Sequence, residues 1–174
     1  MPNQASRDFR PLGICVLTVS DTRTEATDKS GALLVERLQS AGHKLVERRI
    51  VRDDVYAIRS AVSAWIAAPD VDVVLTTGGT GVTGRDGTPE ALEPLLEKRI
   101  DGFGELFRML SYEEIGTSSL QSRCVAGVAN GCFVFALPGS SHACATGWDK
   151  IISHQLDYRT APCNLVELIP RLKE

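Results

Sequence analysis

The sequence lacks several features that would place it in familiar classes. It holds no apolar run of about 18 residues, the length that a membrane-spanning helix needs. The first eleven residues are polar and lack the apolar core of a secretory signal. We therefore expect a flexible arm over 1–11 and a cytoplasmic protein. The formal net charge is −3, which gives no electrostatic reason to expect nucleic acid or a membrane as partner.

Metal-binding and disulfide patterns are also absent. The five cysteines are odd in number and include no CxxC motif, so we predict reduced thiols in a reducing compartment. Cys15 and Cys132 lie in apolar runs and are interpreted as small core residues. The histidines at 43, 142 and 154 form neither HExxH nor a Cys/His spacing, which argues against a zinc site.

What is present indicates one α/β domain over 12–174. The 174 residues suit a single domain, and 43% of them are hydrophobic. In the first half, strands and helices alternate: strands are predicted at 13–20, 44–51 and 71–77, and helices at 30–42 and 54–68. Ser30 is the expected cap of the first helix. This alternation predicts a three-layer α/β/α fold with a mainly parallel central sheet, since right-handed crossovers place helices on both faces.

The second half is less regular. A helix is predicted at 89–100, with Thr88 as its N-cap and Pro89 in its first turn, although Pro94 weakens this prediction. The turn dipeptide Asn130-Gly131 between two short apolar runs predicts a β hairpin. The remaining expectations are a helix at 102–114, a loop or broken helix at 115–123, a strand at 132–137 and a helix at 141–156.

The segment VVLTTGGTGVTGRDGTPEA (73–91) contains a GxGxxG pattern at Gly79, Gly81 and Gly84. A nicotinamide-dependent oxidoreductase is one interpretation. The pattern, however, follows the third predicted strand instead of the first, and the helix begins only at Thr88. Asp86 would also place an uncompensated negative charge beside the pyrophosphate. A P-loop is disfavoured too, because no Gly-Lys-Ser/Thr follows.

An anion-binding turn is the favoured interpretation of this segment. A glycine-rich turn at the carboxyl end of a parallel strand exposes backbone N–H groups, and a helix N-terminus nearby adds positive potential. The alternative is that the glycines only make a tight turn. An acid beside a phosphate site makes sense if Mg²⁺ lies between them, so Asp86 needs a partner carboxylate. The sequence offers Asp53 or Asp54 after the second strand, although an N-cap role explains that pair equally well.

Other predicted strand ends carry small or acidic polar residues as well. Ser20 and Asp21 follow the first strand, and Pro138-Gly139-Ser140 follows the late strand. Either Ser140 or Ser141 is expected to cap the next helix. Three loop arginines are able to clamp an anion, although each alone is also an ordinary surface residue: Arg23, Arg85 and Arg123.

With these residues in view, the chain resembles the MoaB/MogA family of molybdenum-cofactor biosynthesis proteins, whose domain also forms the G domain of gephyrin. The motifs TVSDTR, TTGGTG…RDGTPEA, GFGELFRMLS, SLQSR and LPGS carry the resemblance, which spans about 12–170 and is closer to MoaB. It implies a parallel-type sheet with a small projecting β hairpin. It also implies a homotrimer or hexamer, and other proteins of the cofactor pathway as further partners.

The resemblance further implies an activity, the adenylylation of the terminal phosphate of molybdopterin by MgATP with release of pyrophosphate. Asp53 and Asp86 would be the catalytic, Mg²⁺-binding acids. The alternative is an oligomer that binds molybdopterin or acts as a scaffold without turnover. Arg52 replaces a proline found in part of the family, and LPGSSHA differs from the MogA and gephyrin version. The implied nucleotide- and pterin-binding residues are Ser20, Asp21, Thr77, Gly78, Gly79, Thr80, Gly81, Thr88, Ser111, Ser122, Arg123, Pro138, Gly139 and Ser140.

Overall fold

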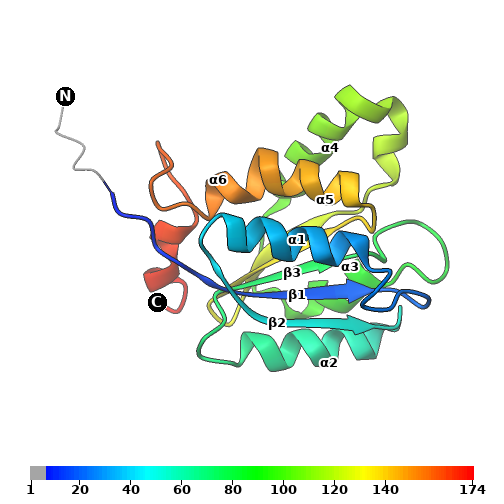
Figure 1. Ribbon diagram of the computed structural model, residues 1–174, viewed down its shortest axis with the longest axis horizontal. Helices are drawn as coiled ribbons and strands as arrows, with labels where there is room; N and C mark the ends of the chain where they lie inside the picture. The colour runs from blue at the N-terminus through cyan, green and yellow to red at the C-terminus, as the bar shows by residue number, and fades with distance from the viewer. Residues whose placement is uncertain (1–6) are drawn as a thin grey trace.

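A six-stranded sheet with the order β2-β1-β3-β6-β5-β4 forms the middle layer of the protein, seen in a computed structural model that describes residues 7–174 (Figure 1). The strands β2, β1, β3 and β6 are parallel, whereas β5 and β4 complete the sheet antiparallel to their neighbours. The predicted fold class is therefore confirmed. The strand bounds are β1 Gly13–Val19, β2 Lys44–Val51, β3 Val73–Thr77, β4 Lys98–Arg99, β5 Val125–Ala129 and β6 Cys132–Leu137.

Helices cover both faces of the sheet (Figure 1). On one face α1, α4 and α5 bury a core that includes Leu34, Phe107 and Trp148. On the other face α2 and α3 bury a second core that includes Ile58 and Leu92. The helix bounds are α1 Lys29–Ser40, α2 Val55–Ile66, α3 Thr88–Leu92, α4 Asp101–Ile115, α5 Ser141–Gly147 and α6 Ser153–Gln155, with a π turn at Trp148–Ile152 and 3₁₀ turns η1 Glu93–Leu95, η2 Gly116–Gln121 and η4 Val166–Arg171.

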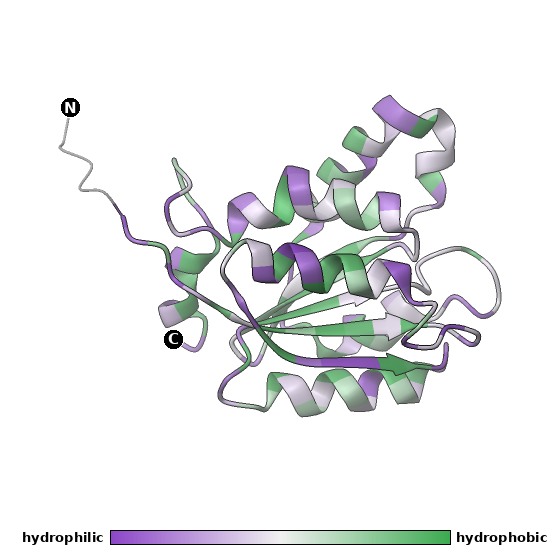
Figure 2. Cartoon of the chain, in the orientation of Figure 1, coloured by the Kyte–Doolittle hydropathy of each residue, from purple (hydrophilic) through white to green (hydrophobic). Residues whose placement is uncertain are grey.

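The inner strands are apolar along their whole length because both of their faces are covered. Every residue of β1, β3 and β6 is buried, and Figure 2 shows β1 and β3 largely in hydrophobic colours. The edge strand β2 is only half-buried and carries a hydrophilic stretch. Cys15 and Cys132 are core residues, as predicted, and all five cysteines are free thiols.

The predicted helix at 89–100 is wrong beyond its first turn. The helix α3 ends at Leu92, a 3₁₀ turn follows, and the chain then becomes extended so that Lys98 pairs with Val128. Pro94 supplies the reason, because a proline lacks the N–H that an α-helix needs at that position. Thr88 is also not the cap. It is the first helical residue, and its hydroxyl donates to Gly78 O over 2.8 Å.

Three of the helix caps bear on the sequence predictions. Asp28, and not Ser30, caps α1 by accepting the Gly31 N–H over 2.9 Å. Asp54 caps α2 by accepting the Ala57 N–H, and Ser140 caps α5, as one of the two expected serines. Because Asp54 takes the capping role, the neighbouring carboxylate is left for another function.

The predicted hairpin is confirmed: β5 and β6 are joined by Asn130-Gly131, both with positive φ. It lies within the sheet, and the part of the chain that projects from the body is instead α4 with η2, an arm drawn in green at the upper right of Figure 1. The segment expected as a loop or broken helix, 115–123, contains the six-residue 3₁₀ turn of that arm.

The predicted N-terminal arm falls partly outside the described residues, which begin at 7. Its described part contacts the body. The Phe9 ring lies 5.1 Å from the His43 ring, and the Arg10 guanidinium lies 3.6 Å from the centre of the Tyr158 ring. Within residues 7–174, no helix is both long and apolar enough to span a membrane.

Candidate functional site

The candidate site lies where the four parallel strands end. Since parallel strands present their carboxyl ends at one edge, the loops after β1, β2, β3 and β6 meet there. Hydrogen bonds join these loops directly. Ser20 N–H donates to Val51 O over 2.9 Å, and Gly78 N–H donates to Leu137 O over 3.0 Å. The Asp53 N–H donates to the Asp21 carboxylate over 3.2 Å.

The glycine turn after β3 depends on two residues in the left-handed region. Gly78 has φ +100° and Gly79 has φ +67°, and a Cβ on either would collide with Val19 O or Thr88 Oγ1. The carbonyls of this turn face inward, where the Thr88 hydroxyl and N–H bind them. Within residues 7–174, the amides of Gly79 and Thr80 donate no hydrogen bond. The turn therefore offers backbone N–H groups of the kind that bind anions.

Asp53 borders this turn from the β2 side. Its Oδ1 accepts the Gly87 N–H over 3.2 Å, and its Oδ2 lies 3.1 Å from where a Cβ on Gly79 would be. Burial raises the pKa of Asp53, and the negative charges of Asp86 and Asp21 raise it further, although the Gly87 N–H bond and, to a smaller extent, Arg85 oppose the rise. A half-buried carboxylate among other carboxylates favours an added cation.

Asp86 borders the turn from its other end. Its Oδ2 accepts the Thr83 N–H over 2.8 Å and the Thr83 hydroxyl over 2.6 Å, and it lies 2.6 Å from where a Cβ on Gly81 would be. Its pKa is lowered, first by the Thr83 hydrogen bond and also by Arg123 nearby. Asp86 therefore stays ionised at neutral pH, as an Mg²⁺ ligand must.

The donor set suits an Mg²⁺ ion that arrives with a phosphate. Within residues 7–174, no group of three or more His, Cys, Asp or Glu side chains is arranged to hold a metal. Proteins commonly bind Mg²⁺ through one or two carboxylates while substrate phosphates and waters supply the other ligands. Asp53 and Asp86 meet this description, which differs from that of a resident structural metal.

Arg123 shapes the loop between the glycine turn and α3. Its guanidinium donates to Gly81 O over 2.7 Å and to Asp86 O over 2.9 Å, and it forms an ion pair with Glu90. Its backbone N–H donates to Thr80 O. Sequence reasoning missed Glu90, although an acid in the first turn of the helix that follows the glycine turn was an available signal. In this structure Arg123 thus binds protein groups, and its role as an anion clamp stays a prediction.

The other predicted site residues divide into two groups. Thr77 is buried and donates to Pro138 O over 2.9 Å, and Gly139 approaches the Gly78 Cα closely enough that a Cβ would lie 3.2 Å from it. These residues set the wall of the turn. The Ser20 hydroxyl instead accepts two N–H groups of its own turn, from Thr22 and Arg23.

Ser111 and Ser122 lie on the side of the projecting arm. Ser111 is buried in α4, and Ser122 lines a polar cavity of about 480 Å³ together with Arg108 and Arg123. In the part of the chain that the structure describes, no hydrogen bond joins either hydroxyl to the glycine turn. The predicted pterin residues thus border the site through Arg123.

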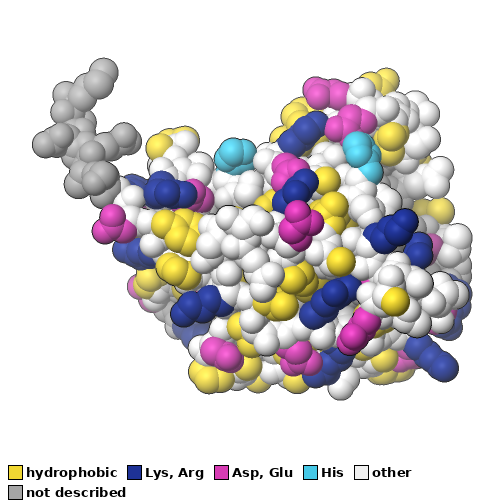
Figure 3. All heavy atoms as spheres, viewed as in Figure 1, with side chains coloured by type: hydrophobic (Ala, Val, Ile, Leu, Met, Phe, Trp, Pro, Cys, Tyr) yellow, Lys and Arg dark blue, Asp and Glu magenta, His cyan; other side chains and the backbone are white. Residues whose placement is uncertain are grey.

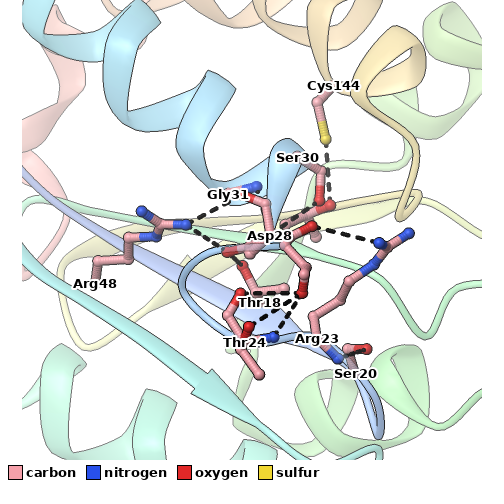
Figure 4. Close-up of polar contacts among 11 residues, drawn as sticks. Thr18, Ser20, Arg23, Thr24, Asp28, Ser30, Gly31, Arg48 and Cys144 are labelled. Carbon is pink, nitrogen blue, oxygen red and sulfur yellow. Dashed lines mark hydrogen bonds and ion pairs between the residues drawn. The ribbon is translucent and has the colours of Figure 1, made fainter.

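A buried carboxylate that sequence reasoning missed supports the loop after β1 (Figure 4). Asp28 is 2% exposed and accepts hydrogen bonds from Thr18 Oγ1 over 2.7 Å, Arg48 Nη2 over 2.8 Å and Gly31 N–H over 2.9 Å. Burial acts to raise the pKa of Asp28, but these hydrogen bonds outweigh it and the pKa is lowered. The network ties β1, β2 and α1 together beneath the loop that carries Asp21.

Comparisons with known proteins agree with this architecture. Residues 15–158 match the family described as a probable molybdopterin binding domain. The chain is 58% identical over 162 residues to molybdenum cofactor biosynthesis protein B of Escherichia coli K12, covering 93% of this chain and 95% of that protein. It is 53% identical over 146 residues to the protein of the same name from Bacillus cereus, covering 83% and 86%.

Solved structures are similar over almost the whole chain. A crystal structure of a molybdenum cofactor biosynthesis protein B has a TM-score of 0.85 at 46% identity, covering 98% of this chain and 99% of that one. A tungsten cofactor synthesizing MoaB from Pyrococcus furiosus has a TM-score of 0.78 at 36% identity, covering 95% and 99%. The chain therefore belongs to the molybdopterin-binding domain family that includes the MoaB and MogA proteins.

Proposed function

We propose that the protein acts in molybdenum cofactor biosynthesis by adenylylating molybdopterin with MgATP. One observation carries the proposal: Asp53 and Asp86, from loops on two different strands, border one glycine turn with free amides. Mg²⁺ bound there would come with the nucleotide and would screen the charge on the phosphates. Family membership supports molybdopterin as the second substrate.

The chemistry explains why such a site would be needed. An oxygen of the terminal molybdopterin phosphate attacks the α-phosphorus of ATP, a new P–O bond forms, and the bond to the β-phosphate breaks so that pyrophosphate leaves with the electron pair. Both reactants are anions, so their repulsion must be reduced before they meet. Amides fixed in the turn present positive dipoles without reorganisation during the reaction, and the two carboxylates would hold the cation, which would supply further positive charge.

The remaining residues of the site would keep this arrangement rigid. Thr88 holds the carbonyls of Gly78 and Gly79, and Arg123 holds those of Gly81 and Asp86, so the amides keep their direction. Small residues at Gly78 and Gly139 let the two loops approach each other closely. Positioning of this kind accounts for a large part of the rate of phosphoryl-type transfers.

The test is direct. Purified protein is mixed with molybdopterin and MgATP, and adenylylated molybdopterin and pyrophosphate are measured over time. Formation of both in equal amounts supports the proposal. Molybdopterin binding with no product at any protein concentration would leave the non-catalytic alternative, in which the oligomer only binds or presents the pterin.

We also propose that the chain assembles with copies of itself through the projecting arm. Large apolar side chains are exposed along α4 and η2, and Figure 3 shows hydrophobic side chains among the charged ones there. Clusters of exposed large apolar side chains commonly mark interaction sites. The cluster consists of Leu106, Met109, Tyr112, Ile115 and Leu120, of which Leu120 is 73% exposed.

Placing charges on this arm should separate the copies. We expect the double variant Met109→Glu, Leu120→Glu to sediment as a monomer, because two carboxylates would be buried unpaired in the contact. The control is Tyr56→Lys on α2, which also places a charge at a strongly exposed apolar position and should keep the wild-type mass. A wild-type chain that is already monomeric in analytical ultracentrifugation would reject this assembly.

Finally, we propose that the protein works in the cytoplasm with reduced thiols. Burial raises the pKa of Cys124 and of Cys144 to about 12, so both remain protonated at neutral pH. All five cysteines are free thiols, and four of them are buried, which is the usual state in a reducing compartment.

A further inference from the structure

Arg85 lies on the glycine loop, one residue before Asp86, and its guanidinium crosses to the loop after β1. There it binds the Asp21 carboxylate through one edge of the guanidinium, Nε to Oδ2 over 3.0 Å and Nη2 to Oδ1 over 2.7 Å. This bidentate pair spans the opening between the two loops. The same carboxylate accepts the Asp53 N–H, so the pair is directly connected to the candidate site.

Arg85 differs from the other two loop arginines in what holds it. Arg123 binds two carbonyls of the loop and the Glu90 carboxylate, so moving it would break the loop's own structure. Arg23 donates to Thr27 O within its own loop. Arg85 binds a carboxylate side chain only, and no backbone atom in residues 7–174 accepts from it.

The pair between Arg85 and Asp21 is easily exchanged. The two side chains are 65% and 40% exposed, and exposed ion pairs contribute little to stability because water screens them. The backbone just before Arg85 is also not packed against other groups, since a Cβ on Gly84 would meet no atom within 4 Å. The guanidinium can therefore leave Asp21 without disturbing packed groups.

Electrostatics favour an exchange toward a phosphate. Asp21, Asp53 and Asp86 gather negative charge at this opening, and Arg85 is the cation that opposes Asp21 and Asp86 in their effect on Asp53. A polyphosphate carries more charge than the Asp21 carboxylate. Its oxygens match the guanidinium fork in the same bidentate geometry, which a lysine ammonium cannot reproduce.

We infer that Arg85 is a phosphate-binding residue that rests on Asp21 in the free protein and transfers its bidentate contact to the phosphates of the nucleotide when MgATP binds. The inference rests on the proposed function for its ligand, and adds to it a specific cation and a resting partner. Asp21 then acts as a competitor for Arg85, so the two residues have opposite effects on nucleotide affinity.

Calorimetric titration with MgATP tests this on the wild type, R85Q, R85K, D21N and the double variant D21N/R85Q. We expect R85Q to weaken binding about 10- to 100-fold, the range for hydrogen bonds to charged groups, and R85K to weaken it less. D21N should tighten binding, since the asparagine keeps an acceptor for the Asp53 N–H but no longer competes for Arg85. The gain from D21N should be smaller in the R85Q background, as coupling between the two sites requires.

Three outcomes separate the possibilities. If the pair only ties the two loops together, R85Q and D21N would weaken binding alike, and the inference is wrong. If R85Q binds MgATP as tightly as the wild type, the inference is wrong while the proposed function stands. A wild type that binds no MgATP overturns both. Thermal unfolding midpoints within about 2 °C of the wild type, expected for an exposed pair, exclude loss of fold as the cause.

Discussion

Replacing Asp86 with asparagine is expected to lower the rate of adenylyl transfer about 10²- to 10³-fold, the usual cost of removing one group that stabilises the charge of the transition state. Asparagine keeps an oxygen that can accept from the Thr83 N–H and hydroxyl, so the loop should retain its shape. Only the negative charge is lost, and with it the ability to hold the cation. The measurement is single-turnover formation of adenylylated molybdopterin.

Two variants separate charge from structure in this experiment. Thr83→Val removes the hydroxyl that binds Asp86 but leaves the carboxylate and its contact with the Thr83 N–H, so its rate should fall less than that of Asp86→Asn. Asp54→Asn removes a neighbouring charge from a residue that only caps α2, and asparagine caps as well as aspartate. Its turnover should match the wild type. An Asp86→Asn rate equal to that of Asp54→Asn would contradict a catalytic role for Asp86.

Replacing Asp28 with alanine is expected to have the largest effect on stability. The carboxylate is buried, and its removal leaves Arg48, the Thr18 hydroxyl and the Gly31 N–H without their shared acceptor. Breaking a buried ion pair from one side costs about 3–5 kcal/mol. For a chain of this size that lowers the thermal midpoint by roughly 10 °C. Differential scanning calorimetry of Asp28→Ala and the wild type measures this difference in thermal midpoint.

The same residue predicts a pH dependence. Since the pKa of Asp28 is lowered in the folded protein, its ionised form stabilises the fold above the unfolded value of 3.8, and this contribution is lost as the pH falls through the folded value. Asp28→Asn keeps the cap but not the charge. In urea unfolding, the free energy of unfolding of the wild type should therefore exceed that of Asp28→Asn at pH 7, and the difference should become smaller at pH 3. A difference of the same size at both pH values would mean that the charge of Asp28 does not contribute to stability.

The parallel half of the fold could be predicted because its sequence signals are local. The inner strands are continuous apolar runs, and each is followed by polar residues where the chain leaves the sheet, so strand ends and loop residues could be located together. The short edge strand β4 could not be predicted. Its two exposed residues, Lys98 and Arg99, show no alternation, and only pairing with β5 makes them a strand.

The candidate site also contains some parts that the sequence predicts and others that it does not. The glycine turn and Asp86 carry signals in the sequence, since glycines and then an acid follow a predicted strand, whereas the residues alone left Asp53 and Asp54 as alternatives. What each arginine binds depends on tertiary contacts: Arg123 meets Glu90 across 33 residues, and Arg85 meets Asp21 across 64. The Asp28 network was missed because Ser30 is an equally good cap by residue type, and only burial beside Arg48 distinguishes the two positions.

The central claim is that the glycine turn binds a phosphate that arrives with a divalent cation held by Asp53 and Asp86. Its most direct test is ATP affinity with and without Mg²⁺, measured by calorimetry on the wild type and on the double variant Asp53→Asn, Asp86→Asn. The wild type should bind ATP more tightly when Mg²⁺ is present, and the double variant should lose that dependence while still binding ATP alone through the turn. Equal wild-type affinity with and without Mg²⁺ would contradict the claim.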